Sequence, residues 1–393
     1  MFVAASLFAV AQPPQGMQNQ HGRPPHGDSS VVPTQNLFGP LTKRIQLHGY
    51  MQAGYEFNNQ NGVNMNEFNF KRAMLVAFAQ ITDRWSFFFL HDFNSEVQEF
   101  YSDFRVTQGK GLNIRLGQFK NSLSLENPYS PSSLELVDVT SQATTFFAGT
   151  VDPLFANKVM YGRDLGLKVF GELAQGQFKY ELAVMNGQGI NISDRNNKKD
   201  YIANLEYAPM PNLRFVVSGQ KGKGNAPDYC WLTGSRDTIS PYNPTIKAGE
   251  DYDRDRWTFG TEYKTFTTTP TSDWKKRPFS IRGEVMGGKD GDVESFGGYV
   301  TTAIPLSSYL DAVASYDYIN YNKDEDYKST KLVIGLQYWF YRNCRLQLQY
   351  SRCMLDNMVS GVSVIPNPAG PPTIIKNFQP DYDKIQLQLQ VGF

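Results

Sequence analysis

The sequence predicts an all-β protein, a transmembrane antiparallel β-barrel of about 16 strands with its third outer loop folded inward. Three observations predict it: the final residues alternate apolar and polar, segments of the same period recur along the chain, and the connections between them are short on one side and longer on the other. The composition agrees, since 22 Tyr and 27 Phe suit β-sheets and the aromatic girdles of a bilayer interface.

The amino end predicts export. The first ten residues are apolar and lead into Ala9-Val10-Ala11, so we expect residues 1–11 to be a partial signal peptide that is cleaved after this element. A disordered tail or a misplaced start codon is the alternative. Residues 12–42 are rich in Pro, Gln, Gly and Asn without apolar periodicity, which predicts a flexible periplasmic leader before a barrel at 43–393.

Period-2 alternation predicts about 16 strands, an even number that places both ends of the barrel in the periplasm. In the first half they are 44–57, 66–80, 84–95, 98–107, 111–119, 162–174, 177–187 and 199–209. In the second half they are 212–223, 252–267, 277–288, 292–304, 309–321, 327–340, 344–357 and 380–393. The last strand shows the pattern best, with Ile385, Leu387 and Leu389 on one face. A half-buried strand of a soluble sandwich would alternate too, so this strand does not decide the fold alone.

The lengths of the connections between strands test the barrel prediction independently of the alternation. Short turns follow even-numbered strands and are assigned to the periplasmic rim, for example Gln175-Gly176 and Met210-Pro211. The connections after strands one, five, seven, nine, thirteen and fifteen are mostly longer, including 224–251 and 359–379, and are assigned to the outside. Two exceptions are a long periplasmic connection at 268–276 and a short outer turn at 287–291.

The longest connection, residues 120–161, follows the fifth strand and is therefore the third outer loop. Apolar residues in 134–139 and at Phe146-Phe147 give it enough apolar surface to pack against a wall. A barrel of about 16 strands has a lumen too wide to select small solutes by itself. We therefore expect this segment to fold inward as a constriction loop. The alternative is an external loop that contacts lipopolysaccharide or a neighbouring molecule.

Several short motifs carry a family resemblance. They are Leu47-His48-Gly49-Tyr50, Gly54-Tyr55, Phe70-Lys71-Arg72-Ala73, Arg115-Leu116-Gly117-Gln118-Phe119-Lys120 and Gly162-Arg163-Asp164-Leu165-Gly166. With them the chain resembles, over residues 43–393, the phosphate-selective porin O and P family, particularly its Bacteroidetes-type outer-membrane members. The resemblance implies a homotrimeric porin of the bacterial outer membrane that passes small, often anionic, solutes. It does not establish phosphate as the substrate.

Alternation also assigns charged residues to the pore side of the wall. The pore-lining candidates are Arg72, Arg105, Arg115, Lys168, Arg282 and Lys384. On the second strand the phase is ambiguous, so Lys71 could take the place of Arg72. A row of cations would replace part of an anion's hydration shell. The inward phase also holds carboxylates, so each cation could instead pair across strands and leave a general pore of mixed charge; these are Asp103, Glu172, Glu262 and Glu284.

The constriction loop contributes three acidic candidates, Glu126, Glu135 and Asp138. Opposite a basic wall they would create a transverse field that orients dipolar solutes. The alternative is that a well-packed loop uses the same carboxylates as turn and capping groups.

Other function classes receive little support. A formal net charge of zero lacks the basic excess of a nucleic-acid binder, and three cysteines do not form a disulfide framework. The run Asp251-x-Asp253-x-Asp255 resembles a calcium loop, but Arg256 stands where that loop needs Gly. We find no nucleophile elbow or phosphate-binding Gly loop, and His91 is the one histidine of the barrel body. We therefore expect neither an enzyme nor a metal or other cofactor.

The function predicted from the sequence is passive diffusion of small hydrophilic solutes, with an anion or phosphate preference set by wall Arg and Lys. The alternative is an outer-membrane barrel that acts mainly as a partner-contact or receptor component of the envelope. Large partner-facing loops would suit that alternative, and the leader is too short to supply the plug domain of an energised receptor.

Overall fold

The computed structural model describes residues 44–149, 162–226, 249–266, 275–365 and 373–393. At 359–365 and 373–377 it describes the backbone alone. The predicted signal peptide at 1–11, the leader at 12–42, Cys230 and the final part of the predicted constriction loop, 150–161, lie outside the described residues.

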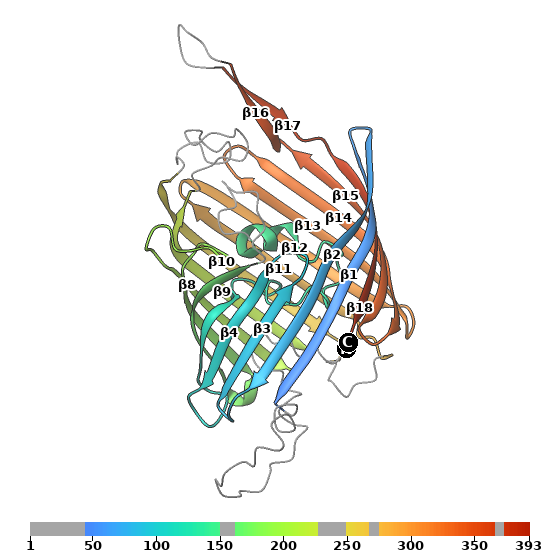
Figure 1. Ribbon diagram of the computed structural model, residues 1–393. Helices are drawn as coiled ribbons and strands as arrows, with labels where there is room; N and C mark the ends of the chain where they lie inside the picture. The colour runs from blue at the N-terminus through green and yellow to red at the C-terminus, as the bar shows by residue number, and fades with distance from the viewer. Residues whose placement is uncertain (1–43, 150–161, 227–248, 267–274, 366–372) are drawn as a thin grey trace, which may run out of the picture.

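Sixteen strands close into one antiparallel barrel, as predicted (Figure 1). In the first half the strands are β1 (Ile45–Gln60), β2 (Val63–Gln80), β3 (Trp85–Asp92), β4 (Val97–Arg105), β5 (Asn113–Lys120), β6 (Arg163–Leu173), β7 (Phe178–Met185) and β8 (Asp200–Met210). In the second half they are β9 (Leu213–Asn225), β10 (Asp251–Lys264), β11 (Ser280–Asp290), β12 (Val293–Pro305), β13 (Leu310–Asn322), β14 (Tyr327–Tyr341), β15 (Cys344–Asp356) and β18 (Tyr382–Gly392).

The barrel is polar inside and apolar outside. Strand β10 shows this clearly, because Arg254 and Arg256 are buried while Trp257 and Phe259 on the opposite face are 48% and 46% exposed. A soluble sheet would bury the aromatic face and expose the charged one. The observed order is the one that a barrel surrounded by lipid requires.

Strands β1 and β18 pair to close the sheet, with Tyr50 opposite Gly392 and Phe57 opposite Ile385. Closure leaves no open edge, so the backbone groups of the wall find partners within the sheet. The β1–β2 ladder is shifted between Gln52 and Ala53: Gln52 lies opposite Arg72, whereas Ala53 lies opposite Phe70. The β-bulge inserts one extra residue, Lys71, into β2 and changes the phase of the strand on either side of it.

One rim carries the short turns, as predicted, but two connections on the other side are shorter than expected. Strands β1 and β2 are joined by Asn61 and Gly62 alone, with positive φ angles of 52° and 78°. This is the geometry of a type I′ hairpin turn, for which Asn-Gly is the preferred sequence. The connection of β13 to β14 is also short, at residues 323–326. On the outer side β1 and β2 are long strands, and the hairpin that they form projects beyond the barrel in Figure 1.

The long outer connection predicted at 359–379 contains two strands that the sequence analysis did not predict. This segment contains a separate two-stranded sheet, β16 (Val359–Ile365) paired with β17 (Thr373–Phe378), which stands above the barrel wall in Figure 1. Both strands are rich in β-branched residues, which favour extended backbone.

Three short helical segments complete the described fold: α4 (Gln142–Thr144), η2 (Thr145–Gly149) and η3 (Ala174–Gly176). None of the helices in the described ranges has the length and apolar character needed to cross a membrane.

Candidate functional site

The segment between β5 and β6 folds into the barrel, where Figure 1 shows its short helical turn surrounded by the wall. We call its described part, residues 121–149, the inward loop. Leu123, Leu134 and Phe147 in it are at most 1% exposed. The prediction that the third outer loop folds inward is confirmed for this part.

Apolar contacts with inward-facing wall residues hold the inward loop on several sides. Phe146 and Phe147 join a buried cluster with Met286, Tyr299 and Ile319 of the wall. Elsewhere Leu136 packs against Ala303, Val313 and Val333. A loop buried this way makes contact with wall residues distant in sequence, which fixes its position across the lumen.

Wall side chains also satisfy backbone groups of the inward loop. The N–H groups of Leu125 and Val137 each donate across 2.8 Å, to the carboxylate of Glu284 and the amide oxygen of Gln349. Arg345 donates to the carbonyl of Leu134 across 2.7 Å. Because most of the loop has no regular secondary structure, these bonds supply the partners that its buried backbone needs.

The Gly162-Arg163-Asp164 motif closes the base of the loop. Gly162 has a φ of +62°, and a Cβ there would lie 2.2 Å from the side chain of Asn127, so only glycine fits. Arg163 donates to Glu99 across 2.9 Å. Asp164 accepts from the backbone N–H of Gly187 across 2.5 Å. The motif therefore joins the end of the loop to the neighbouring strands.

Two predicted pore-lining residues are fully buried cations, each paired with a carboxylate. Arg115 is 0% exposed, donates twice to Asp103 across 2.7 and 2.6 Å, and lies over the ring of Tyr101. Lys168, also 0% exposed, donates to Glu181 across 2.7 Å. The wall at these positions matches the alternative of cross-strand pairing, because each cation is neutralised by a carboxylate.

Three other predicted residues meet at one point. Arg282 of β11 contacts Glu126 across 3.0 Å and also pairs with Glu135, and all three are buried. Glu126 further accepts from the backbone N–H of Ser141 across 2.8 Å. These two loop carboxylates therefore anchor and cap the inward loop.

The remaining loop carboxylate, Asp138, faces lysines of the wall. It lies 2.5 Å from Lys331, 3.3 Å from Lys384 and 3.9 Å from Lys71. The phase of the second strand left open whether Lys71 or Arg72 faces the pore. Because of the β-bulge both do: Lys71 reaches Asp138, and Arg72 donates to Gln52 across 2.9 Å. We call Lys71, Arg72, Lys331 and Lys384 the outer basic cluster.

The outer basic cluster keeps a positive excess and partial exposure. Lys71 and Lys384 also pair with Glu56, and Asp317 of β13 lies opposite Lys331, so the four cations face three carboxylates. The side chains of Lys71, Lys331 and Lys384 are 18%, 10% and 15% exposed. They therefore differ from Arg115 and Lys168, which nothing in solution can reach.

The neighbouring lysines lower the pKa of Asp138. Burial raises the pKa of this carboxyl, but the ammonium groups of Lys331, Lys384 and Lys71 outweigh that effect and hold the pKa well below its usual range. Asp138 therefore remains ionised at any physiological pH.

A second partly exposed group lies near the periplasmic ends of β7, β9 and β10. Lys179 and Arg214 pair with Glu206 across 2.8 and 2.9 Å, and Lys264 pairs with Glu262 across 3.2 Å. Their side chains are 29%, 20% and 30% exposed. We call Lys179, Arg214 and Lys264 the periplasmic basic cluster; Tyr129 of the inward loop donates to Glu262 across 2.6 Å.

Sequence reasoning missed several members of these clusters. Lys331 is on the inward-facing phase of β14, and Lys179 is on the phase of β7 that pairs with Glu206, so alternation could have identified both. Arg105, which was predicted, lies at the periplasmic end of β4 on the same face as Asp103. In the described part of the chain its side chain makes no ion pair.

The aspartate run at the start of β10 points outward rather than around a cation. Asp253 pairs with Lys223 across 2.9 Å and Asp255 with Lys221 across 3.3 Å. Within the described ranges, no group of three or more His, Cys, Asp or Glu side chains is arranged as a metal site.

Comparison with known families supports the fold. Residues 45–217 match the family model described as phosphate-selective porin O and P, which confirms the predicted resemblance over that part. The matched part includes β1 to β8, the beginning of β9 and the inward loop. No curated protein sequence matches the chain.

Solved structures of several other proteins share the barrel fold. OprB of Pseudomonas putida is 12% identical, with 90% of this chain and 95% of that chain covered and a TM-score of 0.60. An anion-selective porin from Comamonas acidovorans is 13% identical, with 89% and 99% covered and a TM-score of 0.59. A trimer form of OmpT of Vibrio cholerae is 11% identical, with 89% and 99% covered and a TM-score of 0.54. At these identities the likeness concerns the fold.

Proposed function

We propose that this chain, an outer-membrane β-barrel of the porin type, lets small hydrophilic solutes diffuse passively across the membrane and favours anions among them. One observation carries the anion preference. Partly exposed cations of the inner wall form two clusters with a positive excess, the outer and the periplasmic basic cluster, while Arg115, Lys168 and Arg282 are buried against carboxylates.

In this proposal an anion meets the outer basic cluster first. The ammonium groups of Lys71, Lys331 and Lys384 replace part of its hydration shell, as cations in other selective pores do. Asp138 and Glu56 offset part of this attraction, so binding stays weak enough for release. The periplasmic basic cluster then receives the anion beyond the inward loop.

The inward loop sets the size limit. Its backbone and its apolar side chains are bonded and packed to the wall at many points, for example at Glu284, Gln349 and Met286. A loop fixed in this way acts as a static constriction. Its role requires no energy source, because solutes move down their own gradients.

We further propose that the chain is exported by a signal peptide at residues 1–11 and works as a homotrimer. The apolar start of the sequence supports the first, and the family resemblance supports the second. Cross-linking of the protein in native outer membranes tests the assembly, since a trimer gives a ladder that ends at three chains.

The family and the fold favour a channel over an enzyme. Phosphate as the solute is the finer form of the proposal, and the family description alone suggests it. The partner-contact alternative remains as the outcome in which a folded barrel does not conduct.

Conductance in a planar bilayer under a salt gradient tests the proposal. We expect an anion-favouring reversal potential that Lys331→Glu and Lys384→Glu shift toward cations. Lys198→Glu, in the connection between β7 and β8, is the matched control and should leave the potential unchanged. Ohmic steps without ion preference would remove the anion claim, and a heat-modifiable barrel that gives no steps would remove the channel itself.

A further inference from the structure

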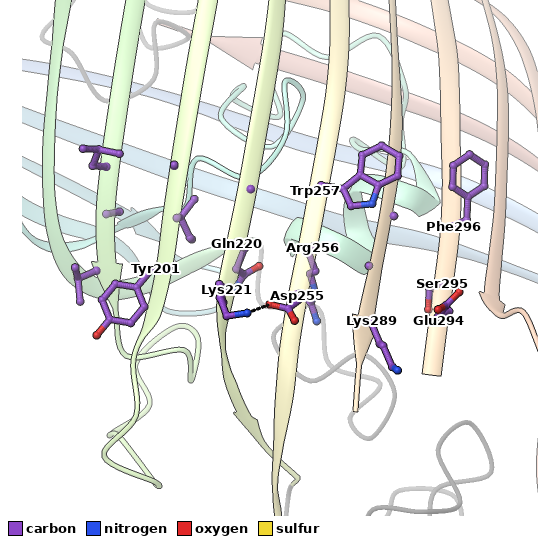
Figure 2. Close-up of a pocket in the computed structure, with 18 of the residues that line it drawn as sticks. Tyr201, Gln220, Lys221, Asp255, Arg256, Trp257, Lys289, Glu294, Ser295 and Phe296 are labelled. Carbon is purple, nitrogen blue, oxygen red and sulfur yellow. Dashed lines mark ion pairs between the residues drawn. The ribbon is translucent and has the colours of Figure 1, made fainter. Parts of the chain in front are cut away.

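A hollow of about 970 Å³ lies over the outer half of strands β6 to β12 (Figure 2). Register places its outward-facing residues in two neighbouring rows across the sheet. The row nearer the outer rim begins with Leu167, Val184 and Tyr201 on β6 to β8; its continuation on β9 to β12, which we call the charged row, contains Lys221, Asp255, Lys289 and Glu294. The next row, the apolar row, contains Leu182, Ala203, Gly219, Trp257, Gly287 and Phe296.

The deepest part of the apolar row is a notch formed by Ala203 and Gly219, which lie opposite each other on β8 and β9. Leu182 and Trp257 stand at its two sides, three strand spacings apart, which is about 14 Å. An opening of this width is wide enough for lipid acyl chains.

The glycine of the notch is not required by the fold. A Cβ added at Gly219 would meet nothing nearer than the carbonyl oxygen of Arg256 at 3.8 Å. At Gly287, by contrast, a Cβ would lie 2.7 Å from the ring of Trp257, so the packing of the chain itself explains that glycine. The space above Gly219 is therefore open toward the membrane.

The two rows together have the polarity of a membrane lipid. Figure 2 shows Trp257 and Phe296 on one side and Lys221, Asp255, Lys289 and Glu294 displaced together toward the other. Lys221 pairs with Asp255 across 3.3 Å, and Lys323 with Glu294 across 3.4 Å. Lys289 lies beside both carboxylates and adds one positive charge beyond these pairs.

We propose that the notch binds a phosphate-bearing lipid of the outer leaflet. Its acyl chain lies along Ala203 and Gly219 against Trp257, and its phosphate meets Lys221, Lys289 and Lys323. Aromatic residues next to a charged row are typical of the bilayer interface, which places the phosphate and the chain at their natural depths. This site is on the opposite face of the wall from the solute path and does not depend on the proposed channel function.

Tryptophan quenching tests the proposal. The probe is phosphatidylglycerol with brominated acyl chains, mixed into phosphatidylcholine vesicles that hold the full-length barrel. The signal of Trp257 is the difference between the natural protein and Trp257→Phe. Trp85, on the lipid-facing side of β3, is the reference, because the two are 48% and 46% exposed. We expect phosphatidylglycerol to associate at Trp257 at least about fivefold more strongly than brominated phosphatidylcholine, the effect of one lysine near an anionic headgroup. Trp85 should show no preference.

Variants separate the site from the surrounding lipid. Gly219→Leu fills the notch and should abolish the preference, whereas Ala314→Leu, which places the same side chain at an outward position of β13, should retain it. Lys221→Gln with Lys289→Gln should also reduce the preference, and these exposed changes leave the notch intact if Gly219→Leu does not fold. Equal quenching by both lipids overturns the proposal. Protection of Trp257 from both lipids overturns it too, and indicates that a second copy of the chain covers the notch.

Discussion

Asp138 is where the inward loop and the outer basic cluster meet. Three lysines surround it, while the other two loop carboxylates are taken up by Arg282. The three acidic residues therefore have different roles, although the sequence pattern predicted one shared role for all of them. Their identities were readable as loop carboxylates, but most of their partners come from strands more than 140 residues away, whereas Lys71 is nearer in sequence.

The low pKa of Asp138 predicts how the channel responds to pH. A carboxyl whose pKa is lowered by folding contributes stability above its unfolded value near 3.8, and that contribution is lost only as the pH falls through the still lower folded value. Between pH 7 and 5 we expect neither the docking of the loop nor the reversal potential to change because of this residue. Asp138→Asn should make the pore more anion-selective across that whole range. An anion preference that rises as the pH falls through 6 in the natural protein, but not in Asp138→Asn, would contradict this assignment.

The Arg115–Asp103 pair predicts a large effect on stability. Arg115→Ala leaves the Asp103 carboxylate buried without its partner, which should lower the free energy of unfolding by about 3–5 kcal/mol. Arg115→Met combined with Asp103→Leu should recover most of that loss, because it removes both charges. Urea unfolding in lipid vesicles measures the difference. A double variant no more stable than the single one would show that the charge is not the cause.

At the scale of elements, the strands were predictable and the loop contacts were not. Period-2 alternation identified the barrel strands because every wall residue faces either lipid or lumen. The Asn61-Gly62 turn was also readable, since Asn-Gly between alternating segments is a strong hairpin signal. The bulge at Lys71 and the bonds from the loop to Glu284 and Gln349 depend on tertiary register, which local patterns do not contain.

The packing of the inward loop against the wall predicts that loosening the loop raises the size limit of the pore. Phe147 is 0% exposed and packs edge-on against Phe146 at 5.0 Å. Phe147→Ala should cost about 3–5 kcal/mol of packing and release this end of the loop. Larger sugars should then enter liposomes in a swelling assay. Phe104→Ala, at a lipid-facing position that is 48% exposed, is the matched control and should not change the limit. An unchanged limit in Phe147→Ala would show that other contacts suffice.

For the whole molecule, we expect stability to depend on closure of the sheet and not on the β16–β17 hairpin outside the barrel. The β16–β17 hairpin forms its own sheet and takes no part in the closed ladder. At its base the N–H of Gln379 donates to the carbonyl of Met358 across 2.7 Å, so the two ends of the segment already meet.

This geometry predicts that the hairpin is dispensable for the barrel. Replacing residues 359–378 by a short Asn-Gly turn should leave heat-modifiable mobility and unit conductance as they are. A turn of the same composition inserted within β15, at Leu348, is the destructive control. A clear fall in the thermal transition of the first variant would mean that the hairpin supports the wall.

The pairing of β1 with β18 also has a consequence for how the protein is made. Gln52 and Gln390, 338 residues apart, share a hydrogen bond of 2.8 Å across the seam. Such a contact forms only after nearly the whole chain is present, so formation of the seam should be a late, slow event. Until then β1 exposes a row of free backbone groups. The unfinished protein therefore depends on envelope chaperones to shield that edge from aggregation, a need that ends when the seam closes.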